Sequence, residues 1–316
     1  MNIMINNYCN LNCEYCFANK IIEKDKQNMS VAAFKQAIDF IKRSKRNNLS
    51  ILGGEPTLHP DFIEFLDIIK NDKDILSLHV FSNGIFTEKI LDAFVTFSKI
   101  KKLSFLINYN LPEILKEREY IIKKNIMELK KNNVEITLGI NIYKRHQENQ
   151  YLIDACHEFN INKIRWALVV PNSIKTARID VKRYFSEFSK DVYKFLDKCS
   201  KNDLDAHVDC NNIPICMISD KDIRRLAYDG NKNLKVSACH PIIDILPDLS
   251  VVRCFALSDN PIKLSNFNNS EEIKDYFEKN VDDKLLNKEL IPECLECSSY
   301  KFRNKSCGCL AYKFYR

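Results

Sequence analysis

Strand-like and helix-like segments alternate regularly over residues 1–200, and this pattern limits the possible folds. The predicted strands are short apolar runs, several of which end in Asn, Gly or Pro. They span residues 2–6, 49–52, 77–81, 103–107, 135–142 and 163–169. Amphipathic helical patterns follow them near 30–45, 60–71, 86–98, 112–132, 147–158 and 181–200. Six such strand–helix units predict a parallel sheet with right-handed crossovers and helices outside.

The fold class that fits is α/β: a partial (β/α)6 TIM-like barrel followed by a small cysteine-rich domain. In such a barrel the chemistry lies at the carboxyl ends of the strands. After about residue 205 the elements become short and the cysteines come in pairs. We therefore predict two domains, a barrel over residues 1–205 and a second domain over 206–316. Because its apolar runs are sparse, the second domain is expected to need its cysteines to fold.

The cysteine content points to metal or cluster binding. The sequence has no apolar run of the ~20 residues that a membrane span needs, and no secretory signal pattern. We therefore expect a cytoplasmic protein with no membrane partner. Disulfides are rare in such a reducing compartment, so 13 cysteines favour metal or cluster ligation. Cys156 and Cys199 stand alone and are interpreted as buried helical residues.

The net charge of +6 does not by itself predict a nucleic-acid partner. The Lys pairs at 101–102, 123–124 and 130–131 fall beside or on amphipathic helices. This pattern favours a solvated surface over a nucleic-acid-binding patch.

Three cysteines lie close together in the segment "YCNLNCEYCF". Cys9, Cys13 and Cys16 have the spacing C-x3-C-x2-C, and Tyr15 and Phe17 flank the last of them. Three thiolates on one short loop can hold three irons of a 4Fe–4S cube, which leaves the fourth iron open to a small ligand. Spacing alone leaves zinc with a fourth ligand from elsewhere as an alternative.

A second motif, "LGGEP" at 52–56, follows the second predicted strand. Together with the cysteine spacing and the aromatic residue beside the last cysteine, it resembles the radical S-adenosylmethionine (SAM) enzymes, over essentially the whole chain. In that family the open iron chelates the amino and carboxylate groups of SAM. An electron from the cluster then cleaves a carbon–sulfur bond, and the resulting 5′-deoxyadenosyl radical abstracts hydrogen from the substrate.

The resemblance implies specific roles for residues of this chain. Cys9, Cys13 and Cys16 would hold the cluster, and an external flavodoxin- or ferredoxin-like protein would supply the electron. Gly53 and Gly54 would let the backbone approach the bound methionine. Backbone groups of Gly54 and Glu55 would meet its ammonium group, and Pro56 would fix the turn.

Further SAM-binding candidates lie beside the last cysteine and at later strand ends. They are Tyr15, Phe17, Ser82, Asn83, Asn108, Asn141 and Arg165. For the strand-end residues among them, a polar side chain in water is the alternative interpretation. No residue is singled out as a catalytic acid or base.

The eight remaining cysteines form pairs in the second predicted domain. They are Cys210, Cys216, Cys239, Cys254, Cys294, Cys297, Cys307 and Cys309. The segment "CHPIIDILPDLSVVRC", followed by "CLEC" and "CGC", resembles the auxiliary iron–sulfur domains called SPASM and twitch. Leu249 stands where those domains usually have Gly, and no cysteine follows Cys309.

The number of auxiliary clusters stays open between two interpretations. A twitch-like arrangement uses Cys239, Cys254, Cys294 and Cys297 for one cluster. A SPASM-like arrangement spreads all eight cysteines over two clusters. A structural zinc ribbon is the alternative to both.

The resemblance favours oxidative modification or crosslinking of a ribosomally synthesised peptide, because an auxiliary cluster can accept the electron that the product radical loses. The first strand starts at residue 2, so we expect a separate leader-peptide-binding protein or leader contact through the second domain. The alternatives are a dehydrogenase of a sugar or aminocyclitol alcohol and a sulfatase-maturase-like enzyme. A partner-binding protein with a carboxyl-terminal zinc module is the alternative of another class.

Overall fold

A computed structural model gives the fold of the chain. It describes residues 1–22, 25–169, 180–208, 213–214, 221, 239–298 and 308–314. The chain forms two compact units. The first comprises Met1–Gly139 and Ile242–Asp275, and the second comprises Ile140–Pro241 and Tyr276–Arg316.

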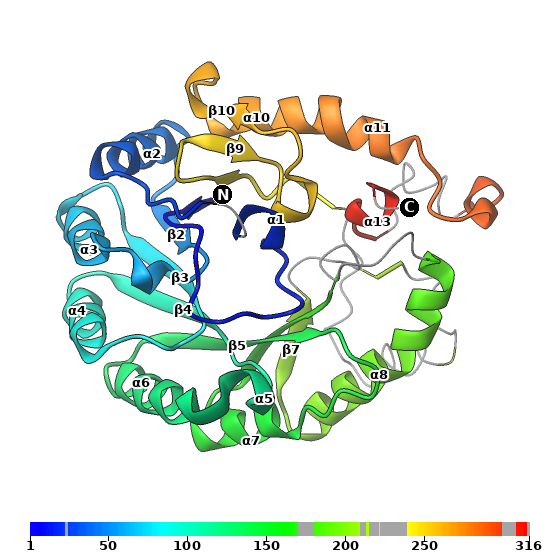
Figure 1. Cartoon of the computed structure of the whole chain (residues 1–316), viewed down its shortest axis with the longest axis horizontal. Coiled ribbons are helices and arrows are strands. Elements are labelled where there is room, and N and C mark those ends of the chain that lie inside the picture. Colours follow the sequence, from blue (N-terminus) through cyan, green and yellow to red (C-terminus); the bar gives the residue numbers. More distant parts are fainter. Residues whose placement is uncertain are drawn as a thin grey trace. The chain divides into compact units, whose positions relative to one another are not determined.

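The first unit is built on parallel strands that neighbour one another in chain order. They are β1 (Asn2–Met4), β2 (Asn48–Leu52), β3 (Ser77–Ser82), β4 (Lys102–Asn108) and the start of β5 (Glu135–Ile142). The helices that connect them lie along the outer side of these strands (Figure 1). They are α2 (Val31–Arg43), α3 (Phe62–Asn71), α4 (Glu88–Ser98) and α6 (Glu119–Lys131).

The core of the first unit lies between the strands and these helices. β3 alternates partly exposed and buried residues, as a strand with one face on the core does. Phe94 of α4 is fully buried, and its ring centroid lies 4.8 Å from that of Phe105 on β4. Phe34 of α2 stacks on Phe65 of α3 with centroids 4.0 Å apart. Burial of such rings, each giving about 1.5–3 kcal/mol, fixes the helices on the sheet.

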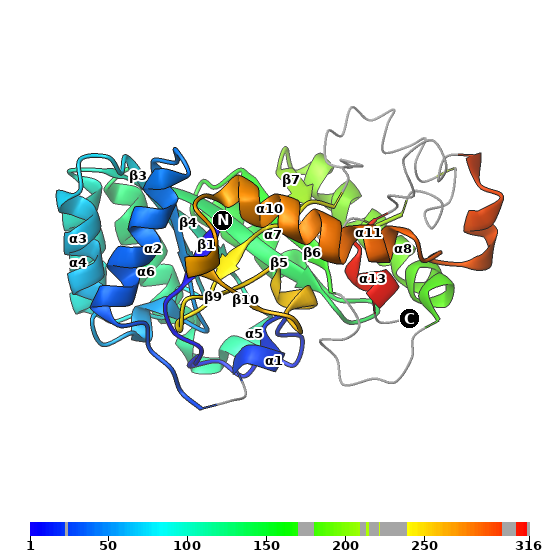
Figure 2. The ribbon, with the colours of Figure 1, turned by 90° about the horizontal axis from the view of Figure 1, so that it is seen from above.

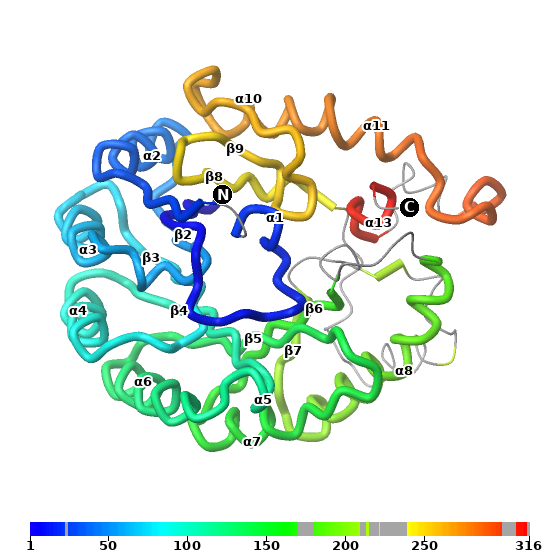
Figure 3. The backbone as a smooth tube through the Cα atoms, in the orientation of Figure 1, coloured from blue at the N-terminus to red at the C-terminus, as the bar shows by residue number. Residues whose placement is uncertain are grey.

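A hairpin from the predicted second domain extends the sheet of the first unit. β8 (Asp244–Ile245) pairs in parallel with β1, and β9 (Ser250–Val252) and β10 (Ile262–Lys263) follow antiparallel. Figure 3 shows this yellow hairpin beside the dark-blue amino-terminal segment. At its turn Leu249 has φ 63°, the left-handed conformation that favours Gly. Leu249 therefore adopts a backbone conformation that Gly would adopt without strain.

The second unit contains β6 (Lys163–Leu168) paired in parallel with β7 (Asp205–Val208), and the helices α7 (Gln150–Glu158) and α8 (Val181–Lys201). Cys156 on α7 and Cys199 on α8 are buried, which confirms their interpretation. Burial raises the pKa of both thiols to about 12, so both are neutral packing residues.

The carboxyl-terminal segments of the second unit pack on α8. The ring of Tyr312, on α13 (Ala311–Phe314), lies 4.7 Å from that of Phe185. Lys182 forms an ion pair with Glu293 of the 3-10 turn η8 (Pro292–Leu295). The described segments at 292–297 and 308–314, which carry cysteines, thus both contact α8.

Other short elements complete the described chain. They are α1 (Asn19–Ile22), α5 (Pro112–Leu115), η2 (Lys116–Arg118), η5 (Phe255–Leu257), η6 (Leu264–Asn266), α10 (Ser270–Phe277), the π-helical turn η7 (Glu278–Asp282) and α11 (Asp283–Leu286). Figure 2 shows α1 and α5 on the same side of the first unit, because each follows the carboxyl end of a parallel strand. Among the helices described, none is long and apolar enough to cross a membrane.

The predicted α/β class, with parallel strands and outer helices, is confirmed. Two details differ from expectation. β7 was not predicted, because "DAHV" is short and polar. The helix expected over 112–132 is broken at Lys116, where φ is 52° and ψ is −134°. The predicted boundary at residue 205 stays a prediction.

Candidate functional site

The "LGGEP" segment lies directly against the start of the cysteine loop. Gly54 N–H donates to Asn6 O at 2.9 Å, and Glu55 N–H donates to Tyr8 O at 2.9 Å. In return Asn6, which is fully buried, donates its Nδ2 to Glu55 O at 2.9 Å. The 3-10 turn η1 (Pro56–Leu58) follows, with proline at its first position. Backbone pairing therefore fixes the loop on the end of β2.

Gly53 and Gly54 are required by this close approach. A Cβ on Gly53 would lie 1.9 Å from Asn6 Oδ1, and one on Gly54 would lie 2.2 Å from Tyr8 O. The missing side chains thus make room for the chain itself. Close approach of this backbone to bound methionine stays a prediction. The N–H groups of Gly54 and Glu55 are engaged within the protein. A carbonyl has a second lone pair, so contact of their carbonyls with an ammonium group stays a prediction.

Glu55 ties the end of β2 to the end of β3. Its side chain is fully buried. Oε1 accepts from Ser82 Oγ at 2.9 Å and from Thr57 Oγ1 at 2.7 Å, and Oε2 accepts from Asn83 N–H at 2.8 Å. Burial raises the pKa of the carboxyl, and these hydrogen bonds oppose the rise. Ser82 Oγ also accepts from Gly84 N–H at 3.0 Å, so this hydroxyl, a predicted SAM ligand, is engaged in the network.

Asn83 extends from this network to the cysteine loop. Its Oδ1 accepts from Ile85 N–H at 2.9 Å, and its Nδ2 donates to Asn10 Oδ1 at 2.7 Å. The same Nδ2 donates to Cys9 Sγ at 3.6 Å. Leu11 N–H reaches this sulfur as well, at 3.4 Å. The structure thus brings together Asn83 and Cys9, two residues that the sequence placed in the site.

The three cysteines of the loop fit a cluster as a donor set. Burial raises the pKa of the Cys9 and Cys13 thiols to about 11, so a positive partner is needed to keep them as thiolates. Among the residues described, no three His, Cys, Asp or Glu side chains are arranged to hold one metal ion. In a cube each thiolate binds its own iron, so Cys9, Cys13 and Cys16 need not converge on one point.

The two aromatic residues of the loop have different environments. Tyr15 is buried, and its side chain hydrogen bonds to Cys13 and to Asn110. Phe17 leaves 45% of its surface exposed, and its ring lies 5.4 Å from that of Phe255. Tyr15 therefore supports the loop, whereas Phe17 presents an apolar face beside it.

Arg118 lies at the cysteine loop, although no sequence pattern predicted it there. Its Nη1 donates to Asn10 O at 2.8 Å, which places a positive charge at the cysteine loop. Burial raises the pKa of Cys13, and the Arg118 charge opposes that rise. Arg118 follows Lys116, whose strained backbone breaks the helix. No sequence signal separates it from the other residues among the 48 Lys and Arg.

A comparison with known families matches the amino-terminal part of the chain, which contains this site. The sequence profile of the Radical SAM superfamily matches residues 3–152. Residues 3–152 are a radical SAM domain. The match covers the cysteine loop, the "LGGEP" segment and the network between them.

Curated relatives support the assignment of this domain. The chain is 29% identical over 155 residues to the 7-carboxy-7-deazaguanine synthase of Clostridium acetobutylicum, which covers 49% of this chain and 65% of that protein. It is 23% identical over 291 residues to an S-adenosylmethionine-dependent nucleotide dehydratase of Selenomonas ruminantium, covering 87% and 88%. The chain spans less than two thirds of the first of these, and 26% of a pterin dimethyltransferase of Methanocaldococcus jannaschii.

Solved structures show the same fold over nearly the whole chain. The structure of anSMEcpe with bound AdoMet has a TM-score of 0.66 at 16% identity, and covers 99% of this chain and 89% of that one. The structure of Streptococcus suis SuiB bound to S-adenosylmethionine has a TM-score of 0.64 at 16% identity, and covers 98% and 72%. The partial-barrel fold is therefore shared with proteins that bind SAM.

The remaining strand-end candidates divide between the two units. Asn108, at the end of β4 in the radical SAM domain, is half-buried, and its carbonyl accepts from Asn110 Nδ2 at 3.2 Å. Asn141 and Arg165 lie in the second unit and contact each other, since Arg165 Nη1 donates to Asn141 Oδ1 at 2.9 Å. Contact of these three residues with SAM stays a prediction.

The described auxiliary cysteines also belong to both units. Cys254 follows β9 in the first unit, and Arg253 Nη1 donates to its Sγ at 3.8 Å. Cys294 and Cys297 lie in the second unit, where Cys297 N–H donates to Cys294 O at 3.3 Å and forms a tight turn. Cys239 and Cys309 also lie in the second unit, whereas Cys210, Cys216 and Cys307 lie outside the described residues. Their grouping into clusters stays a prediction.

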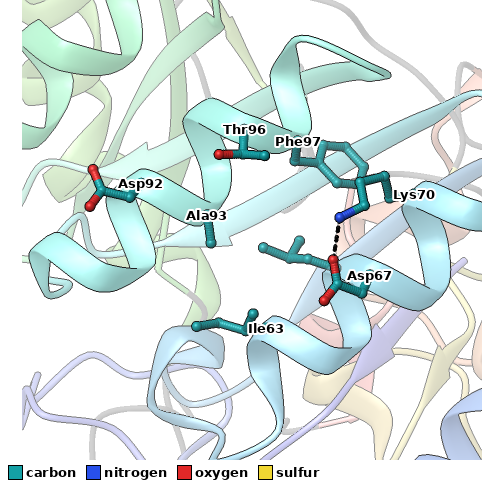
Figure 4. Close-up of a pocket in the computed structure, with 8 residues that line it drawn as sticks. Ile63, Asp67, Lys70, Asp92, Ala93, Thr96 and Phe97 are labelled. Atoms are coloured by element: carbon teal, nitrogen blue, oxygen red, sulfur yellow. Dashed lines mark hydrogen bonds and ion pairs between the residues drawn. The ribbon is translucent and has the colours of Figure 1, made fainter.

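A surface hollow of about 210 Å³ lies elsewhere in the radical SAM domain, between α3 and α4 (Figure 4). Lys70 and Asp67 form an ion pair at its edge. Its lining contains none of the predicted site residues. The candidate site is therefore the cysteine loop with the ends of β2 and β3.

Proposed function

We propose that this chain is a radical SAM enzyme that cleaves SAM reductively and abstracts hydrogen from a substrate. The observation that carries the proposal is the docking of the "LGGEP" segment on the Cys9–Cys13–Cys16 loop, within the domain that the family profile matches. When bound, a 4Fe–4S cluster and SAM supply one electron and a 5′-deoxyadenosyl radical. The protein holds the cluster through these three thiolates.

The residues around the loop have proposed roles in positioning SAM. Phe17 offers an exposed aromatic face beside Cys16. Arg118 places a cation at the loop, which suits the carboxylate of an amino acid. Asn108 completes the polar edge at the end of β4, and Asn141 and Arg165 are proposed to do the same at β5 and β6.

We propose a ribosomally synthesised peptide as the substrate. Two structures of the same fold support this: SuiB bound to precursor peptide SuiA, with a TM-score of 0.58, and anSMEcpe with AdoMet and the Kp18Cys peptide, with a TM-score of 0.62. The cysteines after residue 205 would hold one or two SPASM- or twitch-type auxiliary clusters that accept an electron from the product. A flavodoxin- or ferredoxin-like donor and a separate leader-binding protein belong to the same proposal.

A small-molecule substrate is the second candidate. The match to the nucleotide dehydratase relative covers 87% of this chain and 88% of that protein. Similarity of this extent favours a related chemistry on a small phosphorylated or sugar-like molecule. The division into a barrel over 1–205 and an auxiliary domain over 206–316 serves either substrate.

The first experiment measures SAM cleavage. The full chain is reconstituted anaerobically, reduced with dithionite and incubated with SAM, and 5′-deoxyadenosine is quantified by mass spectrometry. We expect formation of this product, its loss in Cys13→Ala, and its retention in the control Cys156→Ser, whose thiol is buried in α7. Cleavage that persists in Cys13→Ala would refute the proposal.

A second experiment separates the substrates and counts the clusters. Candidate peptides and nucleotides are each incubated with the reduced enzyme and SAM, and a mass change identifies the substrate class. Iron analysis should give about four irons per cluster, so roughly eight or twelve per chain. Abundant zinc with iron for one cluster contradicts the auxiliary clusters.

A further inference from the structure

We propose that Asn83 tunes the cluster electronically, through a hydrogen bond from its side-chain amide to Cys9 Sγ, and that Glu55 is a positioning residue for that amide. The inference rests on the proposed function, because Cys9 must hold a cluster for its sulfur to be tuned. It assigns to Asn83 a role different from direct contact with SAM. The motif glutamate thereby acts on the cluster through its side chain.

The orientation of the Asn83 amide is fixed by its partners. Oδ1 accepts from the N–H of Ile85, which leaves the nitrogen toward Asn10 and Cys9. Asn10 is itself oriented, because its Nδ2 donates to Ile85 O at 3.2 Å and its Oδ1 faces Asn83. A flipped amide would lose both the Ile85 and the Asn10 bonds. The N–H therefore points at the sulfur.

Buried groups on both sides hold the loop that carries Asn83. Glu55 Oε2 accepts from Asn83 N–H at 2.8 Å, and Glu55 Oε1 holds Ser82 at 2.9 Å. From α6, Asn125 Nδ2 donates to Gly84 O at 2.9 Å and to Phe86 O at 3.1 Å. Asn83 itself is 7% exposed. Its amide is thus preorganised and shielded from water. Hydrogen bonds are electrostatically stronger in such a low-dielectric environment than in water.

The consequence for a cluster follows from charge. One-electron reduction transfers an electron from the external donor to the cluster, and no bond is formed or broken. Added negative charge on the thiolate sulfurs strengthens an N–H···S hydrogen bond. Asn83 therefore stabilises the reduced form more than the oxidised form and raises the reduction potential.

The test is a redox titration of the reconstituted full chain, followed by electron paramagnetic resonance of the reduced SAM-binding cluster. Asn83→Ala removes the donor, and Asn83→Asp keeps the shape but replaces the amide by a carboxylate. In both we expect about a tenfold lower ratio of reduced to oxidised cluster at a given poise, which is about 59 mV for one electron. The reduction potential of Asn83→Asp should be equal to or lower than that of Asn83→Ala.

Asn125→Ala is the matched control, because it removes the bonds to Gly84 O and Phe86 O but leaves the bonds that orient the Asn83 amide in place. We expect a lower melting temperature and an unchanged potential. An equal shift in this control, or an unchanged potential in Asn83 variants with full iron content, overturns the inference. Failure of both Asn83 variants to retain iron that Asn125→Ala retains also overturns it, since Asn83 would then be needed for assembly. Absence of iron–sulfur signals in the unmodified chain overturns the proposed function itself.

Discussion

Replacement of Gly54 by Ala tests whether the two motif segments dock as closely as the structure indicates. The added Cβ would lie 2.2 Å from Tyr8 O and 2.3 Å from Tyr8 C, both backbone atoms that no rotamer change can move. The segments must therefore separate. Separation breaks the bonds from Gly54 N–H to Asn6 O and from Glu55 N–H to Tyr8 O.

The expected cost follows from these contacts. Two lost hydrogen bonds account for about 1–3 kcal/mol together, and overpacking against backbone adds about 1–3 kcal/mol. We expect the free energy of unfolding to fall by about 2–6 kcal/mol, measured by urea denaturation of the full chain. Reconstituted iron should fall as well, because the displaced loop carries Cys9.

Two other glycine substitutions test whether close contact with the backbone causes the loss of stability. In Gly139→Ala the Cβ would meet the Asn108 side-chain oxygen at 2.8 Å, a group that can shift, so a loss below about 1 kcal/mol is expected. In Gly53→Ala the nearest atom is Asn6 Oδ1 at 1.9 Å, so the additional substitution Asn6→Ala should recover part of the loss. Gly54→Ala within about 0.5 kcal/mol of the unmodified chain would refute the docking geometry.

Three further predictions concern other residues of the radical SAM domain. Phe94→Ala should lower the free energy of unfolding by about 3–5 kcal/mol in urea denaturation, because its ring packs on Phe105 in the core; a loss below about 1 kcal/mol contradicts this packing. Burial lowers the pKa of His59 below 6.5, and its ring accepts from Asp61 N–H and faces Met29 O. The unfolded chain then binds more protons, so stability should fall as the pH drops from about 6.5 through the lowered folded pKa. His59→Gln should remove that part of the pH dependence between about pH 7.5 and 5.5 in urea denaturation, and an unchanged slope argues against it. Arg118→Met should weaken SAM binding about tenfold or more, because a hydrogen bond to a charged group is lost. Calorimetry measures the affinity, and equal affinity of the variant excludes contact of Arg118 with the SAM carboxylate.

Much of the fold could be read from local pattern. Apolar runs separated by amphipathic stretches predicted β1 to β6 and their helices, because each strand buries a face and each helix a stripe. β7 was not predicted, because Asp205–Val208 has little apolar content and its pairing with β6 forms only in the tertiary structure. The pairing of β8 with β1 could not be predicted either, because the two strands lie far apart in the sequence.

The chemistry predicted for the site came from the sequence alone, because the spacing of Cys9, Cys13 and Cys16 and the "LGGEP" motif are local features of the chain. How the cysteine loop is supported became visible only in the fold. It gave the glycines a packing role against Asn6 and Tyr8, and it brought Arg118 to the loop. The physical reason is that hydrogen bonds and charges act over a few ångströms in space. Asn83 and Cys9, 74 positions apart in the chain, meet only when parallel strands place their carboxyl ends side by side.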